Sequence, residues 1–124
     1  MSEPIGVVIL GSTGSIGVNT LDVLARHPDR FRVVALTAHR NVEGLFGQCL
    51  THQPQVAVMA DPVAAEQLQD RLRVAGQRIE VLTGATGLER VAALPEAGYV
   101  MAAIVGATGL LPTLAAARAG KRVL

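Results

Sequence analysis

Short apolar runs alternate with stretches of helical periodicity along this whole chain. The apolar runs cover residues 6–10, 31–37, 55–60, 79–84 and 99–106. The helical stretches cover residues 15–27, 42–50, 62–74, 87–94 and 109–119. Regular alternation of strand and helix is typical of right-handed crossover units that build a parallel sheet. We therefore predict an α/β fold, a doubly wound parallel sheet with helices on both faces.

The core of such a sheet has to come from aliphatic side chains. Apolar residues make up 50% of the 124 residues, with no Trp, one Tyr and two Phe. Val, Leu, Ile and Ala therefore fill the interior, as in parallel sheets covered on both faces. The length suits one domain over residues 1–124. Residues 122–124 begin a further strand, so we expect the chain to be the N-terminal part of a longer protein.

Charge and cysteine content exclude several classes of protein. The net charge is +1 with acids and bases interspersed, which argues against nucleic acid or an anionic membrane as partner. The single cysteine, Cys49, excludes an intrachain disulfide and a thiolate metal cluster, and we predict a buried structural thiol. We find neither a transmembrane run nor the basic flank of a signal peptide, so we expect a cytoplasmic protein.

Three glycines, Gly11, Gly14 and Gly17, stand between the first strand and the first helix. In Rossmann-like folds this position carries the dinucleotide-binding loop. There Gly11 permits a sharp turn, Gly14 lets backbone approach a diphosphate, and Gly17 lets the helix sit close to the sheet. The free amides of the helix start favour an anion. Three hydroxyl groups add donors: Ser12, Thr13 and Ser15.

The loop has two other interpretations. No lysine follows the glycines, which argues against a phosphate loop of the Walker type. The alternative that stays open is a strand-to-helix turn that needs glycine only for its dihedral angles.

The end of the second strand indicates which dinucleotide would bind. Sites for NAD place an acid here, but this chain has none before Glu43. Arg40 stands where its forked donors suit a 2'-phosphate, which predicts NADP. His39 is a candidate for the adenine end, and Asn41 for ribose or phosphate while it caps its helix. The alternative is a solvated loop with one arginine.

A second small-residue loop, residues 105–109, follows the fifth strand. If that strand lies beside the first, Gly106 and Ala107 would flank the diphosphate or the nicotinamide end. The alternative is a turn that only allows close helix packing.

No set of side chains with evident catalytic or metal-binding chemistry appears. Asp22 and Asp70 fall on helical faces, as solvated surface charges do. His27 and His52 fall near helix ends, where a protonated ring suits the helix dipole. We predict no catalytic residue and no metal ligand in this chain.

Four segments together resemble one known family: "ILGSTGSIG", "NTLDVLARHPDRFRVVALTAHRNV", "PQVAVMAD" and "VMAAIVGATGLLPTLAAARAGKRVL". They are similar to the N-terminal, NADPH-binding domain of 1-deoxy-D-xylulose 5-phosphate reductoisomerases, from about Ile9 to Leu124. The resemblance implies an oxidoreductase and isomerase of non-mevalonate isoprenoid biosynthesis. Such enzymes convert a phosphorylated sugar, 1-deoxy-D-xylulose 5-phosphate, to 2-C-methyl-D-erythritol 4-phosphate, using NADPH and a divalent cation. They are homodimers that fosmidomycin inhibits.

The resemblance also assigns residues. It implies that Thr13, Gly14, Ser15 and Ile16 line the cofactor diphosphate, and that Arg40 and Asn41 hold the 2'-phosphate. The family usually has glycine where this chain has His39, so the local contact there is expected to differ. The family's metal-binding acids and substrate-phosphate residues follow later in its sequence, so we expect this chain alone to be inactive. The alternatives are the nucleotide domain of another NADP-dependent dehydrogenase and a non-catalytic nucleotide-sensing module.

Overall fold

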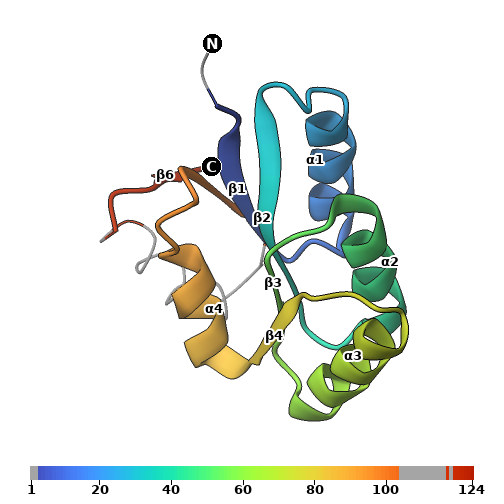
Figure 1. The fold of residues 1–124 in the computed structure, drawn as a ribbon. Coiled ribbons are helices and arrows are strands. Elements are labelled where there is room, and N and C mark those ends of the chain that lie inside the picture. Colours follow the sequence, from blue (N-terminus) through green and yellow to red (C-terminus); the bar gives the residue numbers. More distant parts are fainter. Residues whose placement is uncertain (1–2, 104–116, 118) are drawn as a thin grey trace.

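The computed structural model describes residues 3–103, 117 and 119–124. The described strands form one parallel sheet in the order β4-β3-β2-β1-β5-β6 (Figure 1). Their bounds are β1 Ile5–Leu10, β2 Phe31–Ala38, β3 Val56–Met59, β4 Glu80–Thr83, β5 Tyr99–Ala102 and β6 Arg122–Val123. The predicted parallel α/β fold is confirmed, including the strand that begins at Arg122.

Helices cover both faces of the sheet (Figure 1). The described helices are α1 Ser15–Ala25, α2 Val42–His52, α3 Pro62–Val74 and α4 Gly84–Ala92. α1, α2 and α3 pack on one face, and α4 packs on the other. Within the described residues, no helix combines the length and the apolar character needed to cross a membrane.

Aliphatic side chains fill both layers of the core, as the composition predicts. On one face, β-strand residues such as Ile9 and Leu36 pack against Leu21, Leu45 and Leu68 of the three helices. On the other face, a smaller cluster joins the strands to Leu88 and Val91 of α4. Burial of this aliphatic surface is the main stabilising term of the fold.

β2 carries an extra residue relative to β1. Val7 pairs with Val33 but Val8 pairs with Ala35, so Val34 has no partner in β1. Because side chains alternate with a period of two, the insertion changes the face of every later residue in β2. It places Leu36 and Ala38 in the cluster with α1, α2 and α3.

The helix boundaries follow the capping signals. α3 has the predicted bounds because the Asp61 carboxylate accepts a 2.9 Å hydrogen bond from the Ala64 amide, and Gly76 takes φ +74° after its end. α4 was predicted to begin at Gly87 but begins at Gly84. Thr83 stands at the N-cap of this helix, but its side chain makes no capping hydrogen bond, unlike those of Asn41 and Asp61.

Three further helix boundaries differ from the prediction, and one of them is the end of α4 at Ala92, two residues before the predicted Leu94. α1 ends at Ala25, two residues before the predicted end at His27, and α2 continues to His52. The helix predicted over residues 109–119 lies almost wholly outside the described residues. Gly120, which was predicted to end it, takes φ +76°.

Candidate functional site

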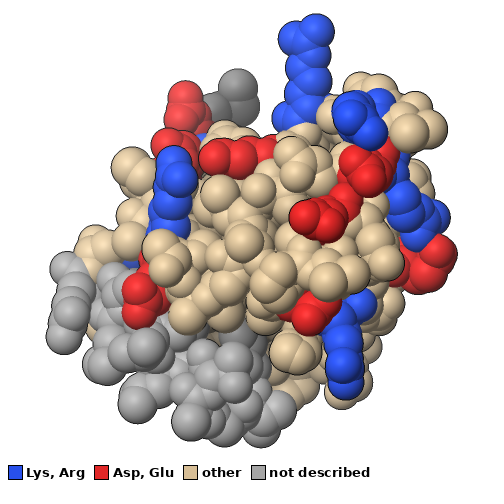
Figure 2. Space-filling view, turned by 90° about the horizontal axis from the view of Figure 1, so that it is seen from below, with Lys and Arg blue, Asp and Glu red and all other residues tan. Residues whose placement is uncertain are grey.

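The chain reverses its order across the sheet at β1, which lies between β2 and β5. The Ala103 amide donates a 2.9 Å hydrogen bond to the Leu10 carbonyl, so β5 ends beside the end of β1. The carboxyl edge at such a reversal is where open α/β sheets bind ligands. The strands run away from the N-terminus in Figure 1, so Figure 2 looks onto this edge. Gly106 and Ala107 lie outside the described residues.

The glycine loop leaves β1 in a conformation that favours glycine. Gly11 takes φ +82°, and its amide donates a 2.9 Å hydrogen bond to the Thr37 hydroxyl oxygen in β2. A Cβ atom on Gly17 would lie 2.4 Å from the Gly11 carbonyl oxygen. Gly17 therefore lets α1 sit close on the loop itself, whereas we had predicted close packing on the sheet.

Gly14 differs from its two neighbours because the fold does not require glycine there. Its φ of −76° and ψ of 171° are open to any residue. A Cβ atom at this position would meet nothing closer than the Gly11 carbonyl oxygen at 3.8 Å. The residue is exposed and stands directly before α1. The missing side chain thus leaves bare backbone open to a ligand at the helix start.

The start of α1 offers unpaired backbone donors to an anion. No side chain caps this helix, and its first turn holds no acid. The Val18 amide makes the first helical bond, to the Gly14 carbonyl, so the amides before it lack helical partners. Ser15 and Ile16 are exposed beside them, with Ile16 61% accessible. Thr13 is half-buried. These features fit a diphosphate.

Ser12 contributes to the loop in another way than we predicted. Its side chain is fully buried, and its hydroxyl lies 2.7 Å from Gln48 Oε1. The Ser12 amide also donates to the Thr37 carbonyl at 2.8 Å. The prediction that Ser12 offers a free hydroxyl donor was wrong, because the hydroxyl is used inside the protein.

The three predicted residues after β2 are exposed at the same edge of the sheet: His39, Arg40 and Asn41. Among the described residues, no carboxylate lies within 4.0 Å of the Arg40 guanidinium. The nearest acid in sequence, Glu43, is paired with Arg71 of α3. Within the part of the chain that the structure describes, Arg40 is therefore a cation without a carboxylate partner. It lies just after β2, the strand that pairs with β1 next to the glycine loop, and this position fits a phosphate.

His39 and Asn41 both have structural tasks. The Asn41 side-chain oxygen accepts a 2.9 Å hydrogen bond from the Gly44 amide and caps α2, as predicted. Only its amide nitrogen is left to donate to a ligand. The His39 carbonyl accepts a 2.9 Å bond from the Asp61 amide, while its ring is exposed.

The remaining titratable candidates have structural surroundings. Cys49 is buried, as predicted, and this burial raises its pKa to about 11 and so disfavours the nucleophilic thiolate. Asp22 and Asp70 are exposed and pair with Arg26 and Arg73 on their own helices, as surface charges do.

His52 corrects one expectation. It is the last residue of α2, where we predicted that a protonated ring suits the dipole. Burial instead lowers the pKa of His52 and so disfavours the protonated ring.

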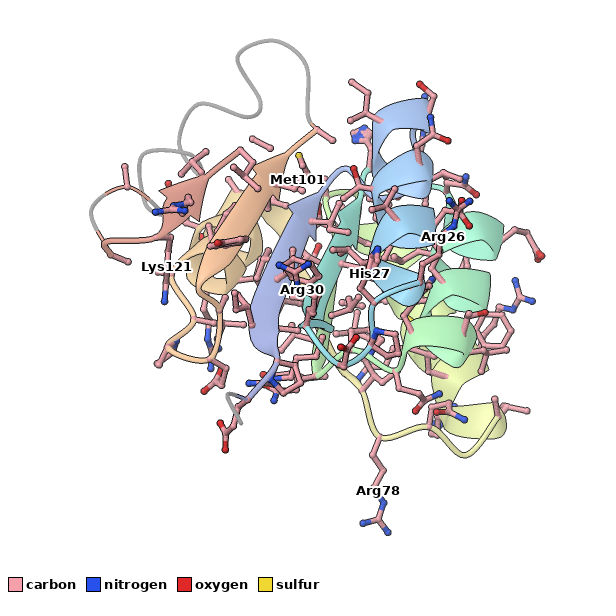
Figure 3. The ribbon with its side chains drawn as sticks, turned by 90° about the horizontal axis from the view of Figure 1, so that it is seen from above. Arg26, His27, Arg30, Arg78, Met101 and Lys121 are labelled. Carbon is pink, nitrogen blue, oxygen red and sulfur yellow. The ribbon has the colours of Figure 1, made fainter. Side chains whose placement is uncertain are left out.

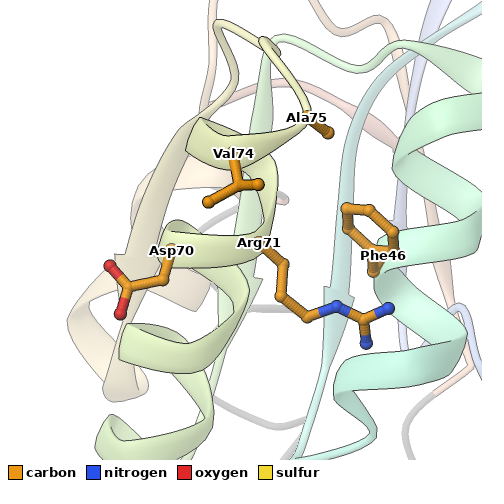
Figure 4. A pocket seen from close by; sticks show the side chains of 5 residues that line it. All are labelled: Phe46, Asp70, Arg71, Val74 and Ala75. Atoms are coloured by element: carbon orange, nitrogen blue, oxygen red, sulfur yellow. The ribbon is translucent and has the colours of Figure 1, made fainter.

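Features away from the carboxyl edge do not add to the site. A hollow of about 320 Å³ lies between α2 and α3, where the Arg71 guanidinium stacks 4.2 Å from the centre of the Phe46 ring (Figure 4). Figure 3 looks onto the opposite edge, where Arg30, Arg78 and Lys121 precede strands. Among the described residues, no three His, Cys, Asp or Glu side chains are grouped so as to hold a metal.

Two residues that shape the loop were missed by sequence reasoning, Thr37 and Gln48. Both hold the loop through hydrogen bonds from distant parts of the chain. Neither follows a motif or a spacing in the sequence, so no local signal could have found them.

The sequence profile of 1-deoxy-D-xylulose 5-phosphate reductoisomerases matches residues 7–124. The chain is 65% identical to the reductoisomerase of Methylococcus capsulatus and 62% identical to that of Nitrosococcus oceani. These alignments cover 96% and 97% of this chain but 30% of each relative. The chain thus spans about 30% of the length of the curated relatives it matches.

Solved structures of reductoisomerases have the same fold. The Zymomonas mobilis enzyme in complex with NADPH aligns with a TM-score of 0.91 and 46% identity, covering 99% of this chain and 32% of that one. A complex with NADPH, fosmidomycin and magnesium aligns with a TM-score of 0.92 and 40% identity, covering 96% and 29%. The match excludes the alternative of another dehydrogenase family. This chain belongs to the 1-deoxy-D-xylulose 5-phosphate reductoisomerase family.

Proposed function

We propose that this chain forms the NADPH-binding part of an enzyme that converts 1-deoxy-D-xylulose 5-phosphate to 2-C-methyl-D-erythritol 4-phosphate. The observation that carries the proposal is Gly14. The fold would accept a side chain there, yet the residue is glycine at the exposed start of an uncapped helix. A ligand that approaches the backbone explains why this residue is glycine. NADPH is such a ligand, because it is bound in the solved structures of related enzymes.

The diphosphate would lie over the loop between Gly11 and Gly17. Amides at the start of α1 would donate to its oxygens, and the positive end of the helix would favour its charge. Thr13 and Ser15 would add hydroxyl donors, and Ile16 would offer apolar contact. Gly106 and Ala107 would flank the diphosphate or the nicotinamide end. The bond between Ala103 and Leu10 supports this proposal, because it places the end of β5 beside the end of β1.

The adenosine 2'-phosphate would pair with Arg40. The absence of a carboxylate partner among the described residues leaves this guanidinium free to form a forked pair with phosphate. The Asn41 amide nitrogen would add a donor. An exposed His39 ring, where the family usually has glycine, would contact the adenine end.

The chemistry that NADPH supplies when bound is hydride transfer. The residues of this chain would bind and orient the cofactor. The substrate, the divalent cation of the magnesium-bound relatives and a homodimeric assembly belong to the proposed whole enzyme. We also propose a cytoplasmic location, since Cys49 is a free buried thiol. We expect no turnover by this chain alone with 1-deoxy-D-xylulose 5-phosphate, NADPH and magnesium, and turnover would contradict this assignment.

Titration with NADPH, followed by its fluorescence, tests the proposal. We expect binding by the unaltered chain and a loss of about tenfold or more in Gly14→Ala, because the methyl group enters the space of the diphosphate. Gly47→Ala is the matched control, since that glycine is exposed within α2 and a Cβ atom there meets nothing within 4 Å. No binding by the unaltered chain, or equal binding by Gly14→Ala, would overturn the proposal.

A further inference from the structure

Gln48 reaches from α2 to the glycine loop and makes two hydrogen bonds to one residue. Its Nε2 donates to the Ser12 carbonyl at 2.8 Å, and its Oε1 lies 2.7 Å from the Ser12 hydroxyl. In the described part of the chain, every other hydrogen bond between two side chains is an exposed ion pair. Gln48 is thus matched to Ser12 by a donor and an acceptor at once.

The start of α1 packs on Ser12. The Ser12 amide donates to the Thr37 carbonyl, and the Ser12 side chain is fully buried. The position of a Cβ atom on Gly17 would be 2.6 Å from the Ser12 Cα atom. The first turn of α1 therefore packs directly on the Ser12 backbone. Whatever holds Ser12 also sets the position of the first α1 amides.

The helix that carries Gln48 also begins at the other end of the candidate site. α2 starts at Val42, its cap is Asn41, and Arg40 comes directly before. One helix therefore reaches the glycine loop through Gln48 and presents Arg40 at its start. A rigid helix of this kind fixes the distance between two parts of a binding site.

We propose that Gln48 is a positioning residue for the cofactor diphosphate. It holds Ser12, and through Ser12 the start of α1, at a fixed position relative to Arg40. Gln48 contacts the loop, and the backbone of the loop contacts the cofactor. This inference rests on the proposed function.

The proposal predicts different effects on the binding of two parts of NADPH, the diphosphate and the 2'-phosphate. Without the Gln48 amide, the buried Ser12 carbonyl loses its partner, and the Ser12 hydroxyl keeps only its 3.2 Å bond to the Thr37 carbonyl. The loop must then shift to recover hydrogen bonds. The diphosphate would then meet misplaced amides, whereas the 2'-phosphate would still meet Arg40. Adenosine 2'-monophosphate carries the 2'-phosphate without the diphosphate, so its affinity reports the Arg40 end alone.

The experiment measures NADPH and adenosine 2'-monophosphate binding to the unaltered chain and to Gln48→Met, which keeps length and removes both polar atoms. We expect NADPH affinity to fall about tenfold and adenosine 2'-monophosphate affinity to change less than about twofold. Gln67→Met is the control, because Gln67 is exposed on α3, and it should change neither. A general loss of structure would weaken both ligands equally, and that result would overturn the positioning role.

The other outcomes of this experiment distinguish a failure of the positioning role from a failure of the proposed function. If the unaltered chain binds NADPH and Gln48→Met binds it equally well, the positioning role fails and the proposed function stands. If the unaltered chain does not bind NADPH, both fail. If Gln48→Met does not fold, Ser12→Ala replaces it. This variant removes the hydroxyl bonds to Gln48 and to the Thr37 carbonyl, and it keeps the bond from Gln48 to the Ser12 carbonyl. We then expect a loss of about threefold for NADPH alone, and unchanged NADPH affinity overturns the inference.

Discussion

The Gly11 amide donates a 2.9 Å hydrogen bond to the side-chain oxygen of Thr37, which joins the end of β1 to the end of β2. The Thr37 carbonyl also accepts the Ser12 amide at 2.8 Å. A single buried residue of β2 thus receives two successive amides of the glycine loop. The loop's path is therefore set by the strand that leads to Arg40.

Replacement of Thr37 by valine tests this relationship. Thr37→Val keeps the shape of the side chain but leaves the Gly11 amide without its acceptor, so we expect a loss of about 1–3 kcal/mol in the free energy of unfolding. Urea unfolding measures it. Thr51→Val is the control, because the Thr51 hydroxyl bonds only to the Gly47 carbonyl on an exposed helix, and its effect should stay within about 0.5 kcal/mol. Equal losses in the two variants would contradict the role of Thr37.

Alanine should have opposite effects at two helical glycines. Gly17→Ala would place a methyl group 2.4 Å from the Gly11 carbonyl oxygen, so it must displace the loop or α1. We expect a loss of about 1–3 kcal/mol in the free energy of unfolding. Gly47→Ala meets nothing within 4 Å in the middle of α2 and should stabilise by about 0.5–1 kcal/mol. Thermal unfolding of both variants decides, and a stabilising Gly17→Ala would refute the close packing.

Much of the fold could be predicted because strand and helix leave local signals. The caps at Asn41 and Asp61 and the glycine after α3 mark their helix boundaries in the sequence, and the structure confirms them. The bulge in β2 could not be predicted. It depends on the pairing of β2 with β1, which the run "FRVVALTA" does not encode by itself.

The candidate site also has features that could be predicted from the sequence and features that could not. The positions of Gly14 after the first strand and of Arg40 after the second were predicted, because they follow from the alternation of elements. The burial of Ser12 and its bonds to Gln48 depend on residues 36 positions apart, and no periodicity relates them. Whether the predicted residues bind NADPH stays a prediction.

Burial of Cys49 should make stability depend on alkaline pH. Its pKa rises from the ordinary 9.0 to about 11 because burial disfavours the thiolate. The folded state therefore holds the proton more tightly than the unfolded state. This contribution is complete below pH 9 and is lost as the pH rises towards 11.

Unfolding free energies measured between pH 8 and 11, the window about that shift, check this expectation. The unaltered chain should lose stability more steeply than Cys49→Ala, in which this titration is absent. Both proteins share all other groups that titrate in the window, so the difference in slope isolates the thiol. Identical slopes would contradict a buried protonated Cys49.

Arg40 provides the most direct test of the cofactor assignment. The 2'-phosphate is the only difference between NADPH and NADH, and the Arg40 guanidinium is the residue assigned to it. Arg78→Ala is the matched control, because Arg78 is exposed before β4 at the opposite edge of the sheet (Figure 3). It should leave both affinities unchanged.

The decisive measurement is therefore the ratio of the NADH and NADPH dissociation constants for the unaltered chain and for Arg40→Ala. We predict that the unaltered chain binds NADPH at least about tenfold more tightly, since a charge-assisted pair with phosphate is lost in NADH. Arg40→Ala should bring the ratio close to one by weakening NADPH alone. Equal affinity of the unaltered chain for both cofactors, or a preference that survives in Arg40→Ala, would contradict the account.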